Sequence, residues 1–260
     1  MKNMSENKKI KPLLIKNGYV IDPANNLNGK MDILIQKGCI EKISKSIVAN
    51  GQTVLDAIGK LVLPGLIDVH THLRQPGRED KETIQTASLA GAKGGFTTLF
   101  AMPNTEPVCD NRSIVEFVKS EALRSAVINI LPIGAISVGQ NGERLAEFFD
   151  MKEAGIVALS DDGHSVSNSY LMRKALEYAR MCGVPVIAHC EDEALSEGGV
   201  MNEGYTSTRL GMMGIPNVAE AIVVARDILL AELTGAPLHI AHVSTKESIR
   251  IIRESKKRGV

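Results

Sequence analysis

The feature that most constrains the fold is a regular alternation of apolar and amphipathic segments, which begins at Leu61 and continues to the last residue. The apolar runs predict six strands: Leu66–His72, Thr97–Met102, Ile128–Ala135, Ile156–Ser160, Val186–His189 and Leu238–Val243. The segments between them predict helices, among them Lys81–Lys93, Ser113–Ser125, Tyr170–Cys182 and Val218–Thr234. Strands that alternate with helices form parallel sheets with right-handed crossovers. Six such repeats fit either an open doubly wound sheet or most of an eight-stranded (β/α) barrel.

The first sixty residues have a different pattern. Short apolar runs are separated there by turn signals such as Asn-Gly, Asp-Pro and Lys-Gly, and this spacing predicts a small antiparallel sheet. The runs are Leu13–Lys16, Tyr19–Ile21, Asp32–Ile35, Ile40–Ile43 and Thr53–Leu55. We therefore expect one domain over residues 1–60 and a second, larger one over residues 61–260.

The composition excludes several classes of function. The 30 basic and 30 acidic residues cancel, so the molecule as a whole presents no cationic field for nucleic acid or an anionic membrane. No run approaches the roughly 20 apolar residues of a membrane helix, and the polar N-terminus does not resemble a secretory signal. Four cysteines without a CxxC pair are typical of a reduced, cytoplasmic protein.

Histidines gather where the predicted strands end. His70 and His72 are two residues apart on the first strand, so both side chains should leave the same face and could share a metal ion. The alternative is one core histidine and one surface histidine. His189 ends the fifth strand and His242 lies at the end of the sixth. Alone, each would more often be a hydrogen-bonded core residue, but four imidazoles converging on one rim favour a divalent cation.

The remaining polar candidates are less distinctive. Asp161 and Asp162 follow the fourth strand, where such a pair is usually a turn or a helix cap, although one carboxylate could supply an anionic metal ligand. His239 falls on the opposite strand face from His242 and is interpreted as structural, and His164, in a polar loop, remains open. Polar residues at strand C-termini are typical of the active site of a (β/α) barrel, which favours the barrel over the open sheet.

Five ordered motifs resemble one known family. The segment LVLPGLIDVHTHLRQPG (Leu61–Gly77) resembles the first-strand signature of the amidohydrolase superfamily and, within it, the class I bacterial dihydroorotases. Four later segments are similar to that family in the same order: GGFTTLFAMPNTEPVCD, LSDDG, PVIAHCED and LHIAHVST. The likeness runs from about Lys11 to Val260. It implies a TIM-like (β/α)8 metal-dependent hydrolase barrel with only about six strands present over residues 61–260, and the N-terminal part of a small β-sandwich domain over residues 1–60.

The resemblance also implies the site and the reaction. It makes His70 and His72 ligands of a more buried zinc ion, Asp162 (less readily Asp161) the carboxylate between the metals, and His189 and His242 ligands of a second ion, so that one or two Zn²⁺ are bound. Arg74 and Asn104 match the residues that hold the substrate carboxylate. An arginine suits that role because its planar fork pairs a carboxylate with two parallel hydrogen bonds. The implied reaction is the interconversion of dihydroorotate and N-carbamoyl-aspartate in pyrimidine synthesis.

The chain departs from the family in one respect, and two alternatives remain. No residue matches the aspartate that ends the eighth strand and acts as the general acid/base, so we expect residues 1–260 alone to have little activity. Dihydropyrimidinases and allantoinases usually bridge their metals with a carboxylated lysine, and no lysine lies between Gly155 and Leu171. The other alternative is that the chain is a non-catalytic partner of aspartate transcarbamoylase. The sequence is also compatible with a homodimer.

Overall fold

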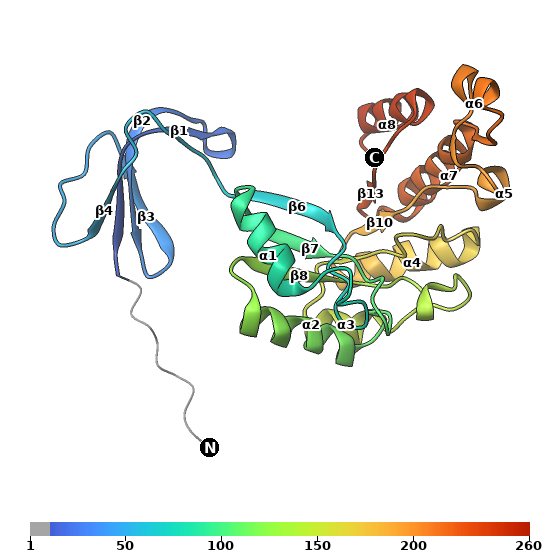
Figure 1. Cartoon of the computed structure of the whole chain (residues 1–260), viewed down its shortest axis with the longest axis horizontal. Coiled ribbons are helices and arrows are strands. Elements are labelled where there is room, and N and C mark those ends of the chain that lie inside the picture. The colour runs from blue at the N-terminus through green and yellow to red at the C-terminus, as the bar shows by residue number, and fades with distance from the viewer. Residues whose placement is uncertain (1–10) are drawn as a thin grey trace. The chain divides into compact units, whose positions relative to one another are not determined.

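The computed structural model describes residues 11–260, which divide after Gly65 into two compact units (Figure 1). The sequence places the boundary at residue 60. The difference arises because Leu61–Val62 forms a short strand, β5, that pairs with the first strand of the chain and therefore lies with the smaller unit.

The smaller unit is a five-stranded sheet in the order β3-β2-β1-β4, with β5 also paired to β1. Its longer strands are β1 (Leu13–Asp22), β2 (Leu27–Gln36), β3 (Cys39–Ser44) and β4 (Thr53–Asp56). The predicted antiparallel sheet is correct for β1, β2 and β3, but wrong for β4, which runs parallel to β1. β5, which was not predicted, also runs parallel to β1. Because β1 and β2 lie between β3 and β4 in the sheet, the segment that joins β3 to β4 crosses from one edge of the sheet to the other. Local turn residues do not predict a connection of this kind.

A buried carboxylate holds that crossing segment in place. Asp32 accepts hydrogen bonds from the backbone N–H of Asn17 and of Ile47, each 2.8 Å long. Burial alone raises the pKa of Asp32, but these bonds and the nearby Lys16 ammonium lower it further, so its net pKa falls below the usual value. Beneath it, Ile47 packs with Leu14 and Leu34 as the apolar core of this unit.

The larger unit contains a six-stranded parallel sheet. Its strands are β6 (Leu66–Thr71), β7 (Phe96–Ala101), β8 (Asn129–Gly134), β9 (Ala158–Leu159), β10 (Val186–Ala188) and β13 (Leu238–Ile240). They neighbour one another in chain order without a reversal. A doubly wound sheet reverses its order at a switch point, whereas a (β/α) barrel does not, so the topology selects the barrel.

The sheet curls strongly. Neighbouring strands lie about 4.8 Å apart, so five steps across a flat sheet would separate β6 from β13 by about 24 Å. Yet the imidazole of His70, on β6, and that of His242, just after β13, have ring centroids only 5.3 Å apart. Side chains at the carboxyl ends of the first and last strands therefore meet across the concave face of the sheet, which a flat sheet would not allow.

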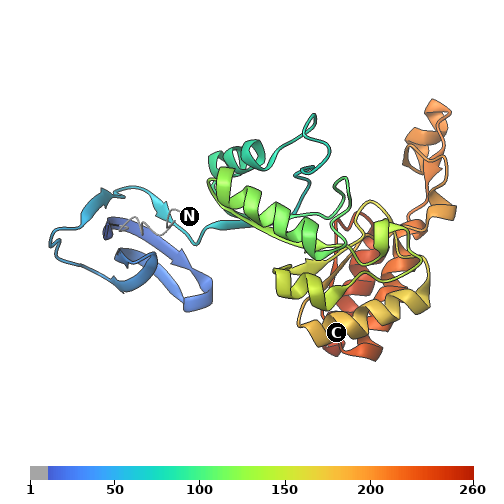
Figure 2. The same ribbon diagram turned by 90° about the horizontal axis from the view of Figure 1, so that it is seen from below.

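Helices follow the strands and pack against the sheet (Figures 1 and 2). They are α1 (Ile84–Lys93), α2 (Arg112–Ser125), α3 (Phe148–Ala154), α4 (Ser169–Cys182), α7 (Val218–Thr234) and α8 (Lys246–Arg258). The first begins three residues later than predicted because the Thr83 side chain caps it, accepting from the N–H of Thr86. Glycines in left-handed conformation end α4 and α7: Gly183 (φ 67°) and Gly235 (φ 63°).

The main apolar core lies between the helices and the strands. Its fully buried members include Met151, Leu159, Met172, Leu176 and Val224, from α3, β9, α4 and α7. A second cluster joins α1 to β7 and β8. Among the described residues, no helix combines the length and the apolar composition needed to cross a bilayer.

A segment of short elements between β10 and α7 is absent from the sequence-based prediction. It comprises α5 (Glu193–Ser196), β11 (Met201–Asn202), α6 (Tyr205–Leu210) and β12 (Gly214–Ile215), with β11 and β12 paired in parallel. The N–H of Asp192 donates to the carbonyl of Ala219 (2.9 Å) and so ties the segment to the start of α7. We refer to residues 193–215 as the excursion.

Candidate metal centre

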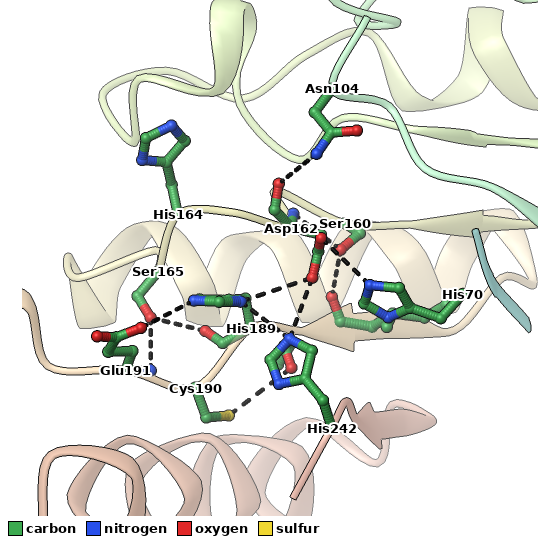
Figure 3. A network of polar contacts seen from close by, with 12 residues as sticks. His70, Asn104, Ser160, Asp162, His164, Ser165, His189, Cys190, Glu191 and His242 are labelled. Carbon is green, nitrogen blue, oxygen red and sulfur yellow. Dashed lines mark hydrogen bonds and ion pairs between the residues drawn. The ribbon is translucent and has the colours of Figure 1, made fainter. Parts of the chain in front are cut away.

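Five predicted metal ligands lie at the carboxyl ends of four strands. His70 is on β6 and His72 directly follows it, Asp162 comes three residues after β9, His189 directly follows β10, and His242 comes two residues after β13. Figure 3 shows the imidazoles of His70, His189 and His242 directed at the carboxylate of Asp162. Side chains that are far apart in the chain thus converge at one end of the curled sheet.

The Asp162 carboxylate divides its two oxygens between two pairs of imidazoles. Oδ2 lies 3.3 Å from His70 Nε2 and 3.5 Å from His72 Nε2. Oδ1 lies 3.5 Å from His189 Nδ1 and 3.2 Å from His242 Nε2. Two trios of candidate ligands result, His70–His72–Asp162 and Asp162–His189–His242, and they share the carboxylate.

These separations fit a zinc ion. Two donor atoms that each lie 2.0–2.2 Å from a tetrahedral zinc are about 3.3 to 3.6 Å apart. The four N···O distances to Asp162 run from 3.2 to 3.5 Å. Imidazole and carboxylate are also the donor types that zinc accepts. The residues present therefore match the metal in both spacing and chemistry.

The protonation states of the cluster also suit a cation. Burial raises the pKa of Asp162, but the hydrogen bonds from His189 and His242 and the neighbouring imidazoles lower it more, so the net pKa lies far below the usual range. Burial is the largest cause that lowers the pKa of His70, and the adjacent His72 and His242 lower it further. At neutral pH Asp162 is therefore an anion and His70 a neutral donor, the forms that bind metal.

Two of the imidazoles are fixed by a partner on their outer nitrogen. His72 Nδ1 lies 3.0 Å from Asn104 Oδ1, and His189 Nε2 lies 3.3 Å from Glu191 Oε2. Because both partners are acceptors, each of these outer nitrogens carries a hydrogen. The hydrogen bond to Asp162 raises the pKa of His189, so without a metal its inner nitrogen can carry a hydrogen as well, which a bound cation would displace. Metal-binding histidines in proteins are held in the same way.

The backbone around Asp162 is held by polar side chains. The hydroxyl of Ser160 accepts from the N–H of Asp162 (3.1 Å) and donates to the carbonyl of Ile187 (2.8 Å). The amides of Gln140 and Asn104 donate to the Asp162 carbonyl at 3.3 and 3.5 Å. These contacts lock the carboxylate between β9 and β10.

The loop that carries His242 is held from α7. His242 has a φ of 32°, in the left-handed region that non-glycine residues rarely adopt. The Glu220 carboxylate accepts from the N–H and hydroxyl of Ser244 (2.8 and 2.6 Å) and of Thr245 (3.0 and 2.8 Å). The loop directly after His242 is thereby fixed, which stabilises an unfavourable backbone conformation.

Several supporting residues were missed by the sequence analysis. Glu191 and Ser160 lie within quoted motifs, so their nearness to His189 and Asp162 along the chain was an available signal. Gln140 and Glu220 lie far from the ligands in sequence and belong to no local pattern that points to them.

Asp161 faces away from the histidines. Its carboxylate accepts from the N–H of Ile136 (2.7 Å) and from the N–H and hydroxyl of Ser137. Burial raises its pKa, against the opposing effect of these hydrogen bonds. His164 is exposed, with Nδ1 3.9 Å from Glu193 Oε1, and Figure 3 shows it apart from the cluster. His239 belongs to neither trio.

The two predicted substrate-binding residues differ in their surroundings. Asn104 contacts His72 and the Asp162 carbonyl and thus lies at the centre. Arg74 lies three residues beyond the end of β6 at Thr71, in a loop, with a φ of 59°. Within residues 11–260 its guanidinium forms no ion pair or hydrogen bond. It is therefore available to an anionic ligand.

A pocket of about 180 Å³ opens beside the second trio. His189, Glu191 and His242 line one side of it, and Asn202 and Ile215 of the excursion line the other. The excursion thus forms part of the wall next to the candidate metal centre.

Residues 59–248 match a protein family described as dihydro-orotase-like. The chain is 54% identical over 248 residues to a dihydroorotase of Acetivibrio thermocellus and 57% identical over 248 residues to one of Pelotomaculum thermopropionicum. Each alignment covers 95% of this chain and 58% of the relative. The chain therefore spans less than two thirds of the length of these relatives.

Solved structures with a similar fold include hydantoinases. An L-hydantoinase (dihydropyrimidinase) from Arthrobacter aurescens has a TM-score of 0.81 at 20% identity, over 96% of this chain and 57% of its own. A D-hydantoinase (dihydropyrimidinase) from Thermus sp. has a TM-score of 0.70 at 28% identity, over 95% of this chain and 56% of its own. These likenesses confirm the predicted fold class, an amidohydrolase (β/α) barrel of which about six strands are present.

Proposed function

Since this chain belongs to the dihydro-orotase-like family, we propose that it forms the metal-binding part of a zinc-dependent dihydroorotase. The reaction would interconvert (S)-dihydroorotate and N-carbamoyl-L-aspartate in de novo pyrimidine synthesis. The observation that carries the proposal is the convergence of four histidines on Asp162 in a chain more than half identical to dihydroorotases. The four free cysteines, which suit a reducing compartment, support a cytoplasmic location.

The ligand set is the basis for the proposed metal role. His70, His72, Asp162, His189 and His242 would hold one or two zinc ions, which when bound supply positive charge that acidifies water and polarises the amide carbonyl. Asp162, ionised at neutral pH, would balance that charge from its place between the two histidine pairs. Asn104 and Glu191 would keep the lone pairs of His72 and His189 directed inward.

Substrate binding is assigned to Arg74 and Asn104. Arg74 has an unpaired guanidinium within the described residues and can form two parallel hydrogen bonds with the carboxylate of dihydroorotate. The Asn104 NH₂ group donates only weakly to the Asp162 carbonyl, at 3.5 Å, so it can donate to a ligand instead while Oδ1 keeps its contact with His72. The proton for the leaving nitrogen has no assigned donor among residues 11–260.

The principal alternative is another cyclic amidase, a dihydropyrimidinase or an allantoinase. The substrates of dihydropyrimidinases lack the carboxylate that Arg74 would bind. The oxygen donor between the histidine pairs is also an aspartate, where those enzymes usually have a carboxylated lysine. A second alternative is that the chain serves as a non-catalytic partner of aspartate transcarbamoylase. Association with that enzyme or with a second copy of this chain is also compatible with a catalytic role.

The test combines binding with turnover. The zinc-loaded protein, its His70→Ala variant and its Arg74→Ala variant are titrated with N-carbamoyl-L-aspartate by calorimetry and assayed with dihydroorotate, dihydrouracil and allantoin. We expect binding of N-carbamoyl-L-aspartate that needs both zinc and Arg74, and slow conversion of dihydroorotate only. Preference for dihydrouracil or allantoin would refute the assignment, and a wild type that takes up no zinc would favour the non-catalytic partner. Turnover as fast as that of the full-length relatives would contradict the expectation of little activity.

A further inference from the structure

The carboxylate of Glu191 contacts the outer ring nitrogen of His189. Its Oε2 lies 3.3 Å from His189 Nε2, the ring nitrogen on the far side from Asp162. We propose that Glu191 is a positioning residue, which orients the His189 imidazole and strengthens it as a metal ligand. This inference rests on the metal centre proposed above, and it concerns a residue that is neither a metal ligand nor a substrate-binding residue in that proposal.

The main chain fixes the place of this carboxylate. The Ser165 hydroxyl accepts from the N–H of Glu191 (2.8 Å) and donates to the carbonyl of His189 (2.6 Å), as Figure 3 shows. One hydroxyl therefore holds both ends of the His189–Glu191 pair. Within the described part of the chain no lysine or arginine forms an ion pair with Glu191, so its charge is not taken by another cation.

The two trios differ in the group behind their fixed histidine. His72 has the neutral amide of Asn104, whereas His189 has the carboxylate of Glu191. A carboxylate that accepts the outer N–H makes the imidazole a stronger donor and fixes its tautomer, and loss of such a partner typically lowers metal affinity about 10- to 100-fold. Glu191 should therefore support the Asp162–His189–His242 trio and leave the His70–His72–Asp162 trio little affected.

The experiment compares Glu191→Ala and Glu191→Gln with a matched control, Glu193→Ala. Glu193 is exposed and lies two residues further along, and among residues 11–260 the one basic group near its carboxylate is His164, at 3.9 Å. Zinc affinity of the whole chain is measured by competition with a chromophoric chelator, and the tautomer of His189 is read from its ¹⁵N shifts in the metal-free protein. The melting temperature of each metal-free variant reports its folding.

We expect Glu191→Ala to weaken the second zinc-binding step about 10- to 100-fold and to leave the first within threefold of wild type. In the metal-free protein, at a pH above the raised pKa of His189, the Nε2–H tautomer of the neutral ring should lose population in Glu191→Ala, because only Asp162 at Nδ1 then remains as an acceptor. Glu191→Gln should keep the tautomer, because its amide oxygen still accepts, with a smaller loss of affinity. Should Glu191→Ala fail to fold, the glutamine variant decides.

Three outcomes would overturn the inference. They are an unchanged second affinity in both Glu191 variants, an equal loss in Glu193→Ala, or an unchanged His189 tautomer in Glu191→Ala. Failure of the proposed function looks different, because a wild type without zinc affinity removes the metal centre before any variant is compared.

Discussion

Replacement of Glu220 by glutamine should loosen the loop that follows His242. In the native protein one carboxylate accepts four hydrogen bonds, with Oε2 serving Ser244 and Oε1 serving Thr245. The amide of Glu220→Gln keeps one oxygen and presents an NH₂ group to the donors of the other residue. Two of the four bonds are therefore lost, and the remaining two no longer involve a charge.

The expected loss of stability is about 2 kcal/mol at pH 7. Burial raises the pKa of Glu220, but the hydrogen bonds, those of Ser244 foremost, lower it to about 2 from 4.5. A drop of that size corresponds to at most about 3 kcal/mol. The carboxylate is partly exposed, and solvent screening reduces the figure. A hydrogen bond to a charged group contributes about 1.5–3 kcal/mol. Two such bonds are lost in Glu220→Gln, but water can bind the freed donors in this partly exposed loop, so a total loss of about 2 kcal/mol is consistent with this range.

The loss should depend on pH with a definite sign. Because the pKa is depressed in the folded state, the carboxylate stabilises the protein fully above its unfolded pKa near 4.5 and less as the pH falls towards 2. The difference between wild type and Glu220→Gln should therefore be largest at pH 6–7 and shrink steadily below about pH 4.5. Urea unfolding of the metal-free proteins at a series of pH values measures it, and the histidines, present in both, cancel.

A matched control tests whether the clamp is the cause. Glu247 also lies in the first turn of a helix, yet within the described part of the chain the polar partners of its carboxylate are limited to Asn217 at 3.4 Å and Lys246 at 3.7 Å. Glu247→Gln should change the free energy of unfolding by less than about 0.5 kcal/mol. A Glu220→Gln effect no larger than this control, or one that stays constant from pH 7 to pH 3, would refute the reasoning.

Three further predictions concern the centre and its support. Zinc at 100 times its dissociation constant should stabilise the wild type by about 2.7 kcal/mol, and Asp162→Asn should lose most of that gain because both trios share the carboxylate; calorimetric melting with and without zinc decides, and an equal gain in both proteins contradicts it. Asp161→Ala leaves the buried N–H groups of Ile136 and Ser137 without their acceptor and should cost about 2–4 kcal/mol in urea unfolding, against less than 1 kcal/mol if that loop is free to rehydrate. Gly77→Ala should cost about 3 kcal/mol or more in urea unfolding, since the added Cβ would overlap the Glu106 carbonyl oxygen at a φ of 99°, and an unchanged free energy of unfolding would contradict this.

The barrel could be predicted because its evidence is local and repeated. Four of the six barrel strands were predicted to within one residue of their observed bounds, whereas β9 and β13 were predicted too long. Histidines at several strand ends favoured the barrel before the strand order was known. The two-residue strand β9 was predicted too long, as Ile156–Ser160, because apolar residues continue beyond the paired positions. The excursion was missed since its elements have at most six residues, too few to show a period.

The sequence predicts which types of residue gather at which strand ends, but it does not predict how their side chains are oriented. Asp161 and Asp162 follow the same strand, and spacing could not separate them. What separates them is the loop at Ile136 and Ser137, which takes the Asp161 carboxylate and leaves Asp162 to the histidines. The roles of Glu191 and Glu220 likewise depend on which groups the fold brings beside them.

The curl of the sheet gives its donor cluster a mechanical consequence. β6 and β13 are the two edge strands of the sheet. His70 on β6 and His242, two residues after β13, both reach Asp162, which follows the central strand β9. An ion bound there would link the two edge strands through its ligands. It would thereby close a ring that the backbone hydrogen bonds of residues 11–260 leave open. Like other crosslinks between distant parts of a chain, such a link restricts the unfolded ensemble most when the loop that it closes is long. Chelators should accordingly open the ring at its edges first, with amide exchange in β6 and β13 rising before that in β8 and β9.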